Sequence, residues 1–123
     1  MVKEFYIPDS IKSSYIERLR PNAGDYSWFN ADVCYYRHEK QRVLLDMLKR
    51  AKIYDLSTLK ILEVGCGFGD NLLHFLMFGA SPQNLYGNDI LTDRIEIARH
   101  RLPATLNLFH SSSLLMLKVI IVK

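Results

Sequence analysis

The sequence predicts an α/β fold in which helices cover a parallel sheet. Short, branched apolar runs alternate with stretches of helical periodicity between residues 59 and 110. The first apolar run ends in a cluster of glycines, and one helical stretch separates each run from the next. Strands that alternate with helices at this spacing are joined by right-handed crossovers, which place parallel strands in one sheet with helices packed on it.

Three strands and two helices make up this pattern. Gly79 is expected to stop the first helix, and Pro103 the second. Asp93 and Glu96 have the spacing of a capping box at the start of the second helix. The expected strands are Lys60–Val64, Asn84–Asp89 and Leu106–His110; the expected helices are Asp70–Phe78 and the segment from Asp93, with Ile95, Ile97, Ala98 and Leu102 on its buried side. This arrangement is a Rossmann-like half-unit, whose ligands bind at the carboxyl ends of the strands.

The residues before the first strand divide into two parts. Prolines and a glycine interrupt the first thirty residues, so we expect an irregular segment there. A long helix is expected to begin after Asn30 or Asp32, either of which is a suitable N-cap. Aromatic residues gather around this start, and they either pack on the sheet or form a lid over a ligand: Tyr26, Trp28, Phe29, Tyr35 and Tyr36.

The C-terminal stretch does not fit the parallel pattern. Leu114 to Val122 is mostly apolar, but it follows the third strand too closely for the crossover of about a dozen residues that a parallel neighbour requires. We therefore expect the parallel sheet to end after its third strand, as in a truncated chain or one whose tail is read out of frame. The expected organisation is an N-terminal segment over residues 1–34, a ligand-binding domain over 35–113 and an apolar tail over 114–123.

Composition limits the classes of function. The chain has 123 residues, 49% of them apolar, and its net charge of +3 comes from dispersed basic residues. Nucleic-acid-binding proteins concentrate far more positive charge on one face, so no dedicated nucleic-acid surface is expected. No apolar stretch approaches the ~20 residues that span a membrane. Two cysteines without a CxxC pair and four histidines without metal spacing predict a cytoplasmic protein with neither disulfides nor a metal site.

The residues that carry chemistry follow the first strand. An acid precedes a loop with glycines at alternate positions, and the segment reads Glu63, Val64, Gly65, Cys66, Gly67, Phe68 and Gly69. Alternate glycines let the backbone turn tightly and approach a ligand with no Cβ in the way. Free N–H groups of the next helix face the same cleft. Cys66 is expected to be a small loop residue rather than a nucleophile, because no histidine stands at a suitable distance.

The loop differs from the two glycine loops that bind phosphates. A dinucleotide fingerprint has a third glycine where this chain has Asp70, whose charge would repel a pyrophosphate. The Gly-Lys-Ser/Thr ending of a P-loop is absent as well. Asp89, twenty residues after Gly69, ends the second strand and can accept hydrogen bonds from both hydroxyls of a ribose. These residues predict a nucleoside site without a phosphate clamp.

Three segments of the chain resemble motifs I and II of class I S-adenosylmethionine (SAM)-dependent methyltransferases: ILEVGCGFG, LYGNDI and an Ile/Ala-rich helix that ends in Arg-Leu-Pro. The resemblance covers roughly residues 38–109. It implies that Gly65, Cys66 and Gly67 pass close to the methionine part of the cofactor. It also implies that Asp89 holds the ribose.

The resemblance assigns two further residues and shows one departure. Glu63 would support the loop, and Ile90 would pack on the adenine. Members of the family carry an acid just past the third strand, where this chain has His110 followed by three serines. A hydroxyl or backbone group is expected to take the place of that acid.

The implied function is methyl transfer from SAM to an acceptor, with a small molecule as the expected acceptor. In the family most substrate-binding and catalytic residues lie beyond the third strand, so we nominate no catalytic residue and expect the chain alone to be inactive. Two other classes stay open. One is an NAD- or nucleotide-dependent Rossmann enzyme, which Asp70 disfavours, and the other is a non-catalytic SAM-binding or interaction fragment.

Overall fold

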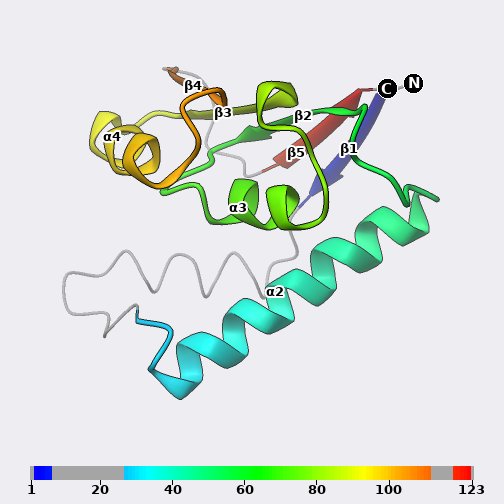
Figure 1. Cartoon of the computed structure of the whole chain (residues 1–123), viewed down its shortest axis with the longest axis horizontal. Coiled ribbons are helices and arrows are strands. Elements are labelled where there is room, and N and C mark those ends of the chain that lie inside the picture. Colours follow the sequence, from blue (N-terminus) through cyan, green and yellow to red (C-terminus); the bar gives the residue numbers. More distant parts are fainter. Residues whose placement is uncertain (1, 7–26, 112–117, 123) are drawn as a thin grey trace. The chain divides into compact units, whose positions relative to one another are not determined.

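A computed structural model describes residues 2–6, 27–111 and 118–122 of the chain (Figure 1). The chain divides into two compact units, one made of residues 1–6 and 55–123 and the other of residues 7–54. The larger unit contains a five-stranded sheet with two α-helices. The described part of the smaller unit contains the long helix α2 (Ala31–Arg50), whose N-cap Asn30 accepts a hydrogen bond from the N–H of Asp32, as the sequence predicts.

The centre of the sheet follows the predicted alternation of strands and helices. Its strand order is β1-β5-β2-β3-β4. The parallel strands are β2 (Lys60–Val64), β3 (Leu85–Asp89) and β4 (Asn107–His110), and a short 3-10 turn, η1 (Pro82–Asn84), precedes β3. The α/β class is therefore confirmed, and the parallel part of the sheet contains three strands.

Two antiparallel strands complete the sheet, which is therefore mixed. β5 (Lys118–Val122) lies between β1 (Val2–Tyr6) and β2 and runs antiparallel to both. The exclusion of a parallel strand in the C-terminal stretch is thus confirmed for residues 118–122, whereas residues 114–117 lie outside the described part. The expectation of irregular structure over the first thirty residues is wrong for Val2–Tyr6. A strand of five residues is too short for its periodicity to identify it, and its partner lies at the other end of the described chain.

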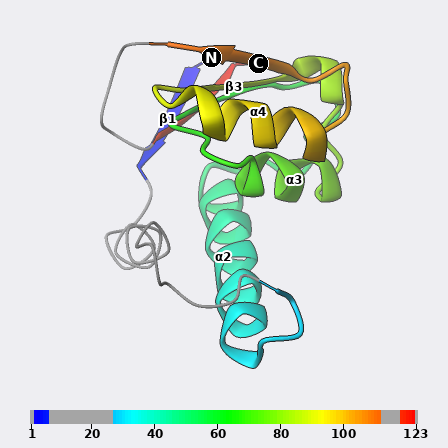
Figure 2. The ribbon, with the colours of Figure 1, turned by 90° about the vertical axis from the view of Figure 1, so that its left-hand side faces the viewer.

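Helices α3 (Asp70–Met77) and α4 (Thr92–Arg101) lie on the same face of the sheet (Figures 1 and 2). Alternate strand residues point toward this face, because the side-chain period of a strand is two. The hydrophobic core of the larger unit is built from these strand residues and the inner sides of the two helices: Ile61, Leu85, Val119, Ile121, Leu72, Phe75, Ile95 and Ala98, each at most 2% exposed.

The start and inner side of α4 differ in two details from the prediction. The helix begins at Thr92, and its N-cap residue Leu91 makes no side-chain cap bond, so the capping box of Asp93 and Glu96 does not form. The N–H of Leu91 bonds instead to the Asp89 carboxylate at 2.8 Å. Ile97, expected on the buried side, is 46% exposed, because it lies two residues from Ile95 and therefore on the opposite side of the helix.

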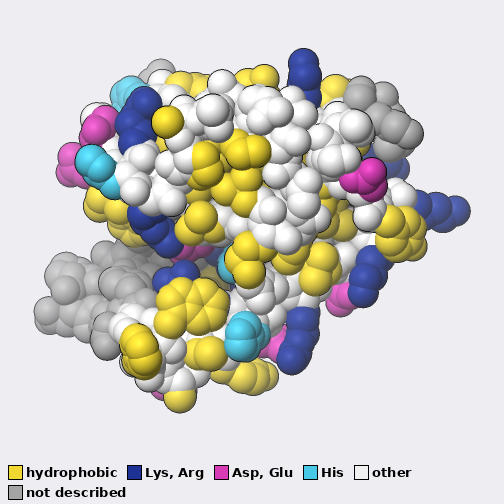
Figure 3. Space-filling model, viewed as in Figure 1, with side chains coloured by type: hydrophobic (Ala, Val, Ile, Leu, Met, Phe, Trp, Pro, Cys, Tyr) yellow, Lys and Arg dark blue, Asp and Glu magenta, His cyan; other side chains and the backbone are white. Residues whose placement is uncertain are grey.

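The opposite face of the sheet has an apolar surface of its own. Leu62, Tyr86 and Ile120 line a shallow pocket of about 280 Å³ together with Phe109 and Val122. In the view of Figure 3, lysine and arginine side chains are scattered among acidic and apolar ones rather than gathered into a stripe. No helix in the described part of the chain has the length and apolar character of a membrane span.

Candidate functional site

The glycine loop connects β2 to α3 and is attached to the end of β3. Gly65, Gly67 and Gly69 have φ angles of 74°, 55° and 87°, in the left-handed region that favours glycine. The N–H of Cys66 donates to the carbonyl oxygen of Asn88 at 2.8 Å, and the N–H of Gly65 donates to Asn88 Oδ1 at 3.2 Å. The loop thus lies at the carboxyl edge of the sheet, where the parallel topology predicts it.

Asp89 stands between the loop and the start of α4. Its Oδ2 accepts a hydrogen bond from the N–H of Gly67 at 2.9 Å, and its Oδ1 accepts one from Leu91 at 2.8 Å. The residue is 5% exposed, and its carbonyl oxygen accepts a bond from the N–H of Ser111 at 3.1 Å. Sequence reasoning missed these backbone donors to its carboxylate. Each carboxylate oxygen retains a second acceptor position.

Glu63 lies beneath the loop at only 1% exposure. Asn71 Nδ2 donates a hydrogen bond to Glu63 Oε2, and Asn71 is itself 5% exposed in the first turn of α3. This contact joins the end of β2 to the first turn of α3, so it holds the two ends of the loop together. The sequence contains a weak signal for Asn71, a polar side chain among apolar ones at the start of a buried helix.

Cys66 is buried between acidic groups. Burial raises the pKa of the Cys66 thiol, and the carboxylates of Glu63 and Asp89 raise it further. The thiol is therefore neutral at physiological pH, and this agrees with its expected role as a small loop residue, because the thiolate is the nucleophilic form.

Gly87 makes room for this loop on the neighbouring strand. A Cβ atom at Gly87 would lie 2.7 Å from Leu72 Cδ1 and 3.0 Å from Cys66 Sγ. Only glycine lets α3 and the loop approach β3 so closely. Sequence reasoning did not select this residue, although a glycine inside a strand is itself a sign of close approach by another segment.

Asp70 is paired with a cation, which the sequence did not suggest. Its Oδ1 lies 2.7 Å from Arg101 Nη2, and Arg101 Nη1 donates to the carbonyl oxygen of Phe68 at 2.8 Å. Arg94 Cζ lies 5.7 Å from the centre of the Phe68 ring. The repulsion of a pyrophosphate by Asp70 is therefore weaker than for an isolated carboxylate, because a guanidinium lies beside it.

Ile90 follows Asp89 and presents apolar surface at the same edge. It is 40% exposed, and its carbonyl oxygen lies 3.0 Å from His110 Nε2. The structure thus brings together the loop, Asp89, Ile90 and the end of β4. Ser112 and Ser113 lie outside the described residues, so the expected substitute for the family's acid stays a prediction.

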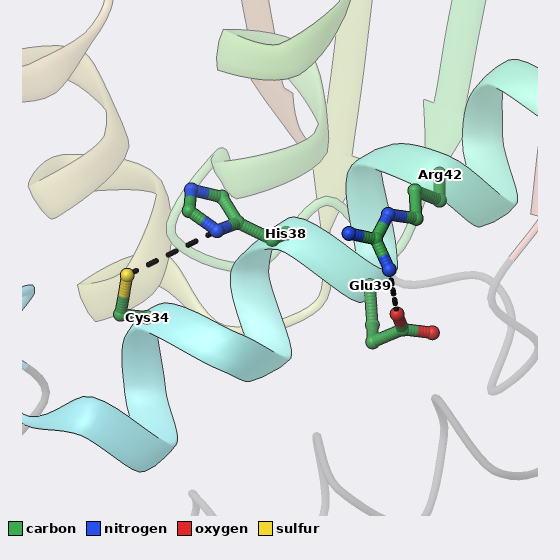
Figure 4. Close-up of polar contacts among 4 residues, drawn as sticks. All are labelled: Cys34, His38, Glu39 and Arg42. Atoms are coloured by element: carbon green, nitrogen blue, oxygen red, sulfur yellow. Dashed lines mark hydrogen bonds and ion pairs between the residues drawn. The ribbon is translucent and has the colours of Figure 1, made fainter.

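The smaller unit has its own polar contacts, which Figure 4 shows along α2. Cys34 Sγ lies 4.0 Å from His38 Nδ1, and Arg42 Nη1 lies 2.6 Å from Glu39 Oε1. The structure as described contains no group of three or more His, Cys, Asp and Glu residues that could hold a metal ion.

The aromatic residues near the start of α2 are described only in part. The Arg37 guanidinium lies 5.0 Å from the centre of the Trp28 ring, and Phe29 and Tyr35 are exposed. Tyr26 lies outside the described residues. Both roles predicted for these aromatic residues, packing on the sheet and forming a lid over a ligand, remain predictions.

Comparisons with known proteins identify fungal methyltransferases as relatives. The chain is 31% identical to methyltransferase ausD of Aspergillus calidoustus over an alignment 100 residues long, and the match spans 72% of this chain and 32% of that protein. It is 45% identical over 38 residues to methyltransferase trt5 of Aspergillus terreus, and 38% identical over 52 residues to methyltransferase adrK of Penicillium rubens. These two matches cover 31% and 42% of this chain and 14% and 17% of the respective relatives.

The chain spans about a third of the length of the first of these relatives and less of the other two. No family profile matches the chain. No solved structure matches it either. The three similarities support a relationship to methyltransferases in general.

Proposed function

We propose that this chain provides the cofactor-binding part of a class I SAM-dependent methyltransferase. The observation that carries the proposal is the position of Asp89, whose carboxylate ends β3 within hydrogen-bond distance of the glycine loop that follows β2. In doubly wound sheets a nucleoside binds at this edge, with its ribose hydroxyls on an acid that follows the second strand. Similarity to three fungal methyltransferases supports methyl transfer as the activity.

Charge around the loop fits a sulfonium better than a pyrophosphate. Three carboxyl groups, those of Glu63, Asp70 and Asp89, lie within or beside the loop, and Arg101 pairs with one of them. Acidic groups attract a cation and repel phosphates at this range. The left-handed glycines supply a backbone that a ligand can approach without meeting a Cβ.

We assign each residue of the proposed site the role that the family resemblance implies. The backbone of Gly65, Cys66 and Gly67 would lie along the methionine part of SAM. Asp89 would accept the ribose hydroxyls, while Ile90 would pack on the adenine. Glu63 would support the loop through its bond to Asn71. Phe68 and Gly69 would shape the end of the loop, next to α4.

SAM, when bound, supplies an activated methyl group. The residues of this chain would orient it and exclude water from it. A small molecule is the proposed methyl acceptor, and no described residue is nominated as catalytic. We also propose a cytoplasmic location, since both cysteines are free thiols.

Parallel titration with S-adenosylhomocysteine and NAD tests the proposal. Binding to the native state raises the melting temperature by mass action, so S-adenosylhomocysteine is expected to raise it and NAD at equal concentration is not. A larger shift with NAD would favour the alternative of a nucleotide-dependent Rossmann enzyme. Binding of S-adenosylhomocysteine by a full-length protein that transfers no methyl group would favour a SAM-binding protein without catalysis.

A further inference from the structure

Arg101, the last residue of α4, reaches back to the end of the glycine loop. Its Nη1 donates to the carbonyl oxygen of Phe68 at 2.8 Å, and its Nη2 donates to Asp70 Oδ1 at 2.7 Å. Phe68 and Asp70 flank Gly69, so one planar guanidinium holds the chain on both sides of this glycine. A planar fork of donors is suited to such a bridge, because it can bind two acceptors at once in a fixed geometry.

The carbonyl of Phe68 determines where the next N–H points. Phe68 C=O and Gly69 N–H belong to one trans peptide, so they point in opposite directions. Arg101 holds the carbonyl, and the N–H of Gly69 donates to the carbonyl oxygen of Cys66 at 3.0 Å. The guanidinium thereby fixes the peptide plane that closes the turn over Cys66 and Gly67.

The same end of the loop packs against the last turns of α4. A Cβ atom placed on Gly69 would lie 2.7 Å from Leu102 Cδ1 and 3.6 Å from Ala98 Cβ. Arg94, seven residues before Arg101 and on the same side of the helix, lies over the Phe68 ring. Asp89 binds the N–H of Gly67 just before α4 begins. Residues near both ends of α4 therefore hold the loop.

We propose that Arg101 is a positioning residue for the cofactor loop. It holds the Phe68–Gly69 peptide in the orientation that lets Gly65, Cys66 and Gly67 lie along the ligand. This role rests on the proposed function of the site. Without Arg101 the glycine-rich backbone populates other peptide orientations, and apparent affinity falls in proportion to the fraction of loops that remain competent to bind.

Arg101→Met tests this role, with Arg99→Met as the matched control. Arg99 lies on the same helix, and it bonds to Glu96 at 3.5 Å and to the carbonyl oxygen of Leu108 at 3.3 Å, away from the loop. S-adenosylhomocysteine is titrated calorimetrically at a temperature well below the melting point of every variant. Arg101→Met is expected to weaken binding about tenfold, and Arg99→Met less than about twofold. Equal affinities of Arg101→Met and the wild type would overturn the proposal.

A conservative variant and a second readout cover the remaining outcomes. If Arg101→Met does not fold, Arg101→Lys replaces it: an ammonium can reach the Phe68 carbonyl or Asp70 but not grip both as a fork, so an intermediate loss is expected and unchanged affinity overturns the role.

If the wild type itself does not bind S-adenosylhomocysteine, the proposed function fails, and amide exchange decides the positioning role. The Gly69 amide is then expected to exchange faster in the Arg101 variant while the amides of the β2–β3 ladder do not change. An unchanged exchange rate of the Gly69 amide would overturn the positioning role of Arg101.

Discussion

The carboxylate of Asp89 is hydrogen-bonded to the backbone of the glycine loop. Its two carboxylate oxygens accept N–H bonds from Gly67 and Leu91, which belong to different segments. A carboxylate offers about four acceptor positions, so two hydroxyl donors can join two amides. The side chain thus serves the fold and, in the proposed function, the ligand. The effect of an Asp89 substitution on the stability of the fold must therefore be measured separately from its effect on ligand affinity.

Asp89→Ala is expected to weaken S-adenosylhomocysteine binding by about 2–4 kcal/mol, roughly thirty- to several-hundred-fold, because both hydroxyl acceptors are lost. Asp89→Asn keeps one acceptor and should lose less, although its NH₂ group then faces an N–H donor. Calorimetric titration measures the affinity, and circular dichroism verifies the fold. Asp93→Ala, on the exposed side of α4, is the control and should stay within about threefold. Equally small changes in both Asp89 variants would exclude the ribose role.

Cys66 makes the stability of the fold sensitive to alkaline pH. Its thiol has a raised pKa in the folded protein because it is buried, beside Glu63 and Asp89. A raised folded pKa contributes stability that is fully present below the unfolded pKa, about 8.5, and is lost as pH rises above it. The unfolded thiol ionises in that range while the folded thiol remains protonated.

Cys66→Ser removes this titration. Above about pH 8.5 the wild type should therefore lose up to about 1.4 kcal/mol of unfolding free energy per pH unit relative to the variant. Urea unfolding of both proteins between about pH 7 and pH 10 measures the difference, in which the contributions of other titrating groups cancel. Parallel pH curves for the two proteins would contradict the argument.

Among the elements, helices α2 and α3 end in the same hydrogen-bond pattern, but different residue types occupy its left-handed position. After α3, the N–H of Gly79 bonds to the carbonyl of Leu76, and the N–H of Ala80 bonds to that of Phe75. Lys52 and Ile53 make the equivalent bonds after α2. This is the Schellman motif, whose C′ residue is left-handed. Gly79 has φ of 106° and Lys52 has φ of 58°, so only the second carries the steric cost of a Cβ.

Removing the glycine that follows α3 and introducing one after α2 should change stability in opposite directions. Gly79→Ala should lower the unfolding free energy by about 1–2 kcal/mol, the cost of left-handed backbone with a Cβ. Among the described residues, apart from its two chain neighbours, no atom lies within 4 Å of the added Cβ, so this cost reports backbone conformation rather than a clash. Lys52→Gly should raise the unfolding free energy by less than about 1 kcal/mol, since glycine also has more freedom to lose on folding. Urea unfolding measures both, and changes of the same sign would contradict this account.

Elements whose signals are local could be predicted from the sequence. β2, α3 and the Gly79 stop follow from residues only a few positions apart, and the convergence of the loop with Asp89 follows from the rule for parallel strands. Contacts between distant segments could not be predicted. β1 depends on β5, the N–H donors of Asp89 depend on the path of the loop, and Arg101 meets Phe68 only after α4 has packed. Ile97 was misassigned because an apolar residue does not by itself define a helix face.

At the scale of the whole molecule, both described ends of the chain meet in the sheet, as Figure 1 shows for β1 and β5. In the doubly wound order 3-2-1-4-5-6, the strands β4, β3 and β2 take the first three positions. The next position is filled by β5, which runs the opposite way, so that Lys118 lies opposite Val64. The carboxyl end of β2, where the glycine loop begins, is thus bordered by the start of β5 rather than by the end of a parallel strand.

β5 should therefore determine stability much more than its short length indicates. It pairs with strands on both sides, and Val119 and Ile121 are 1% and 2% exposed in the core beneath it. Ile121→Ala is expected to lower the unfolding free energy by about 2–5 kcal/mol, a large share of the ~5–15 kcal/mol available to a domain. Val2→Ala on the edge strand is the control: this side chain is 64% exposed, so its loss should cost less than about 0.5 kcal/mol.

Deleting whole strands extends the comparison. A chain without residues 118–123 loses both ladders of β5 and its buried side chains, so it should show no cooperative urea transition. A chain without residues 1–6 loses one edge ladder and should unfold cooperatively at lower urea. Circular dichroism across a urea series distinguishes the two. A cooperative transition near that of the wild type in the chain that lacks β5 would mean that β2, β3 and β4 fold with α3 and α4 on their own, and that β5 is a dispensable addition to the sheet.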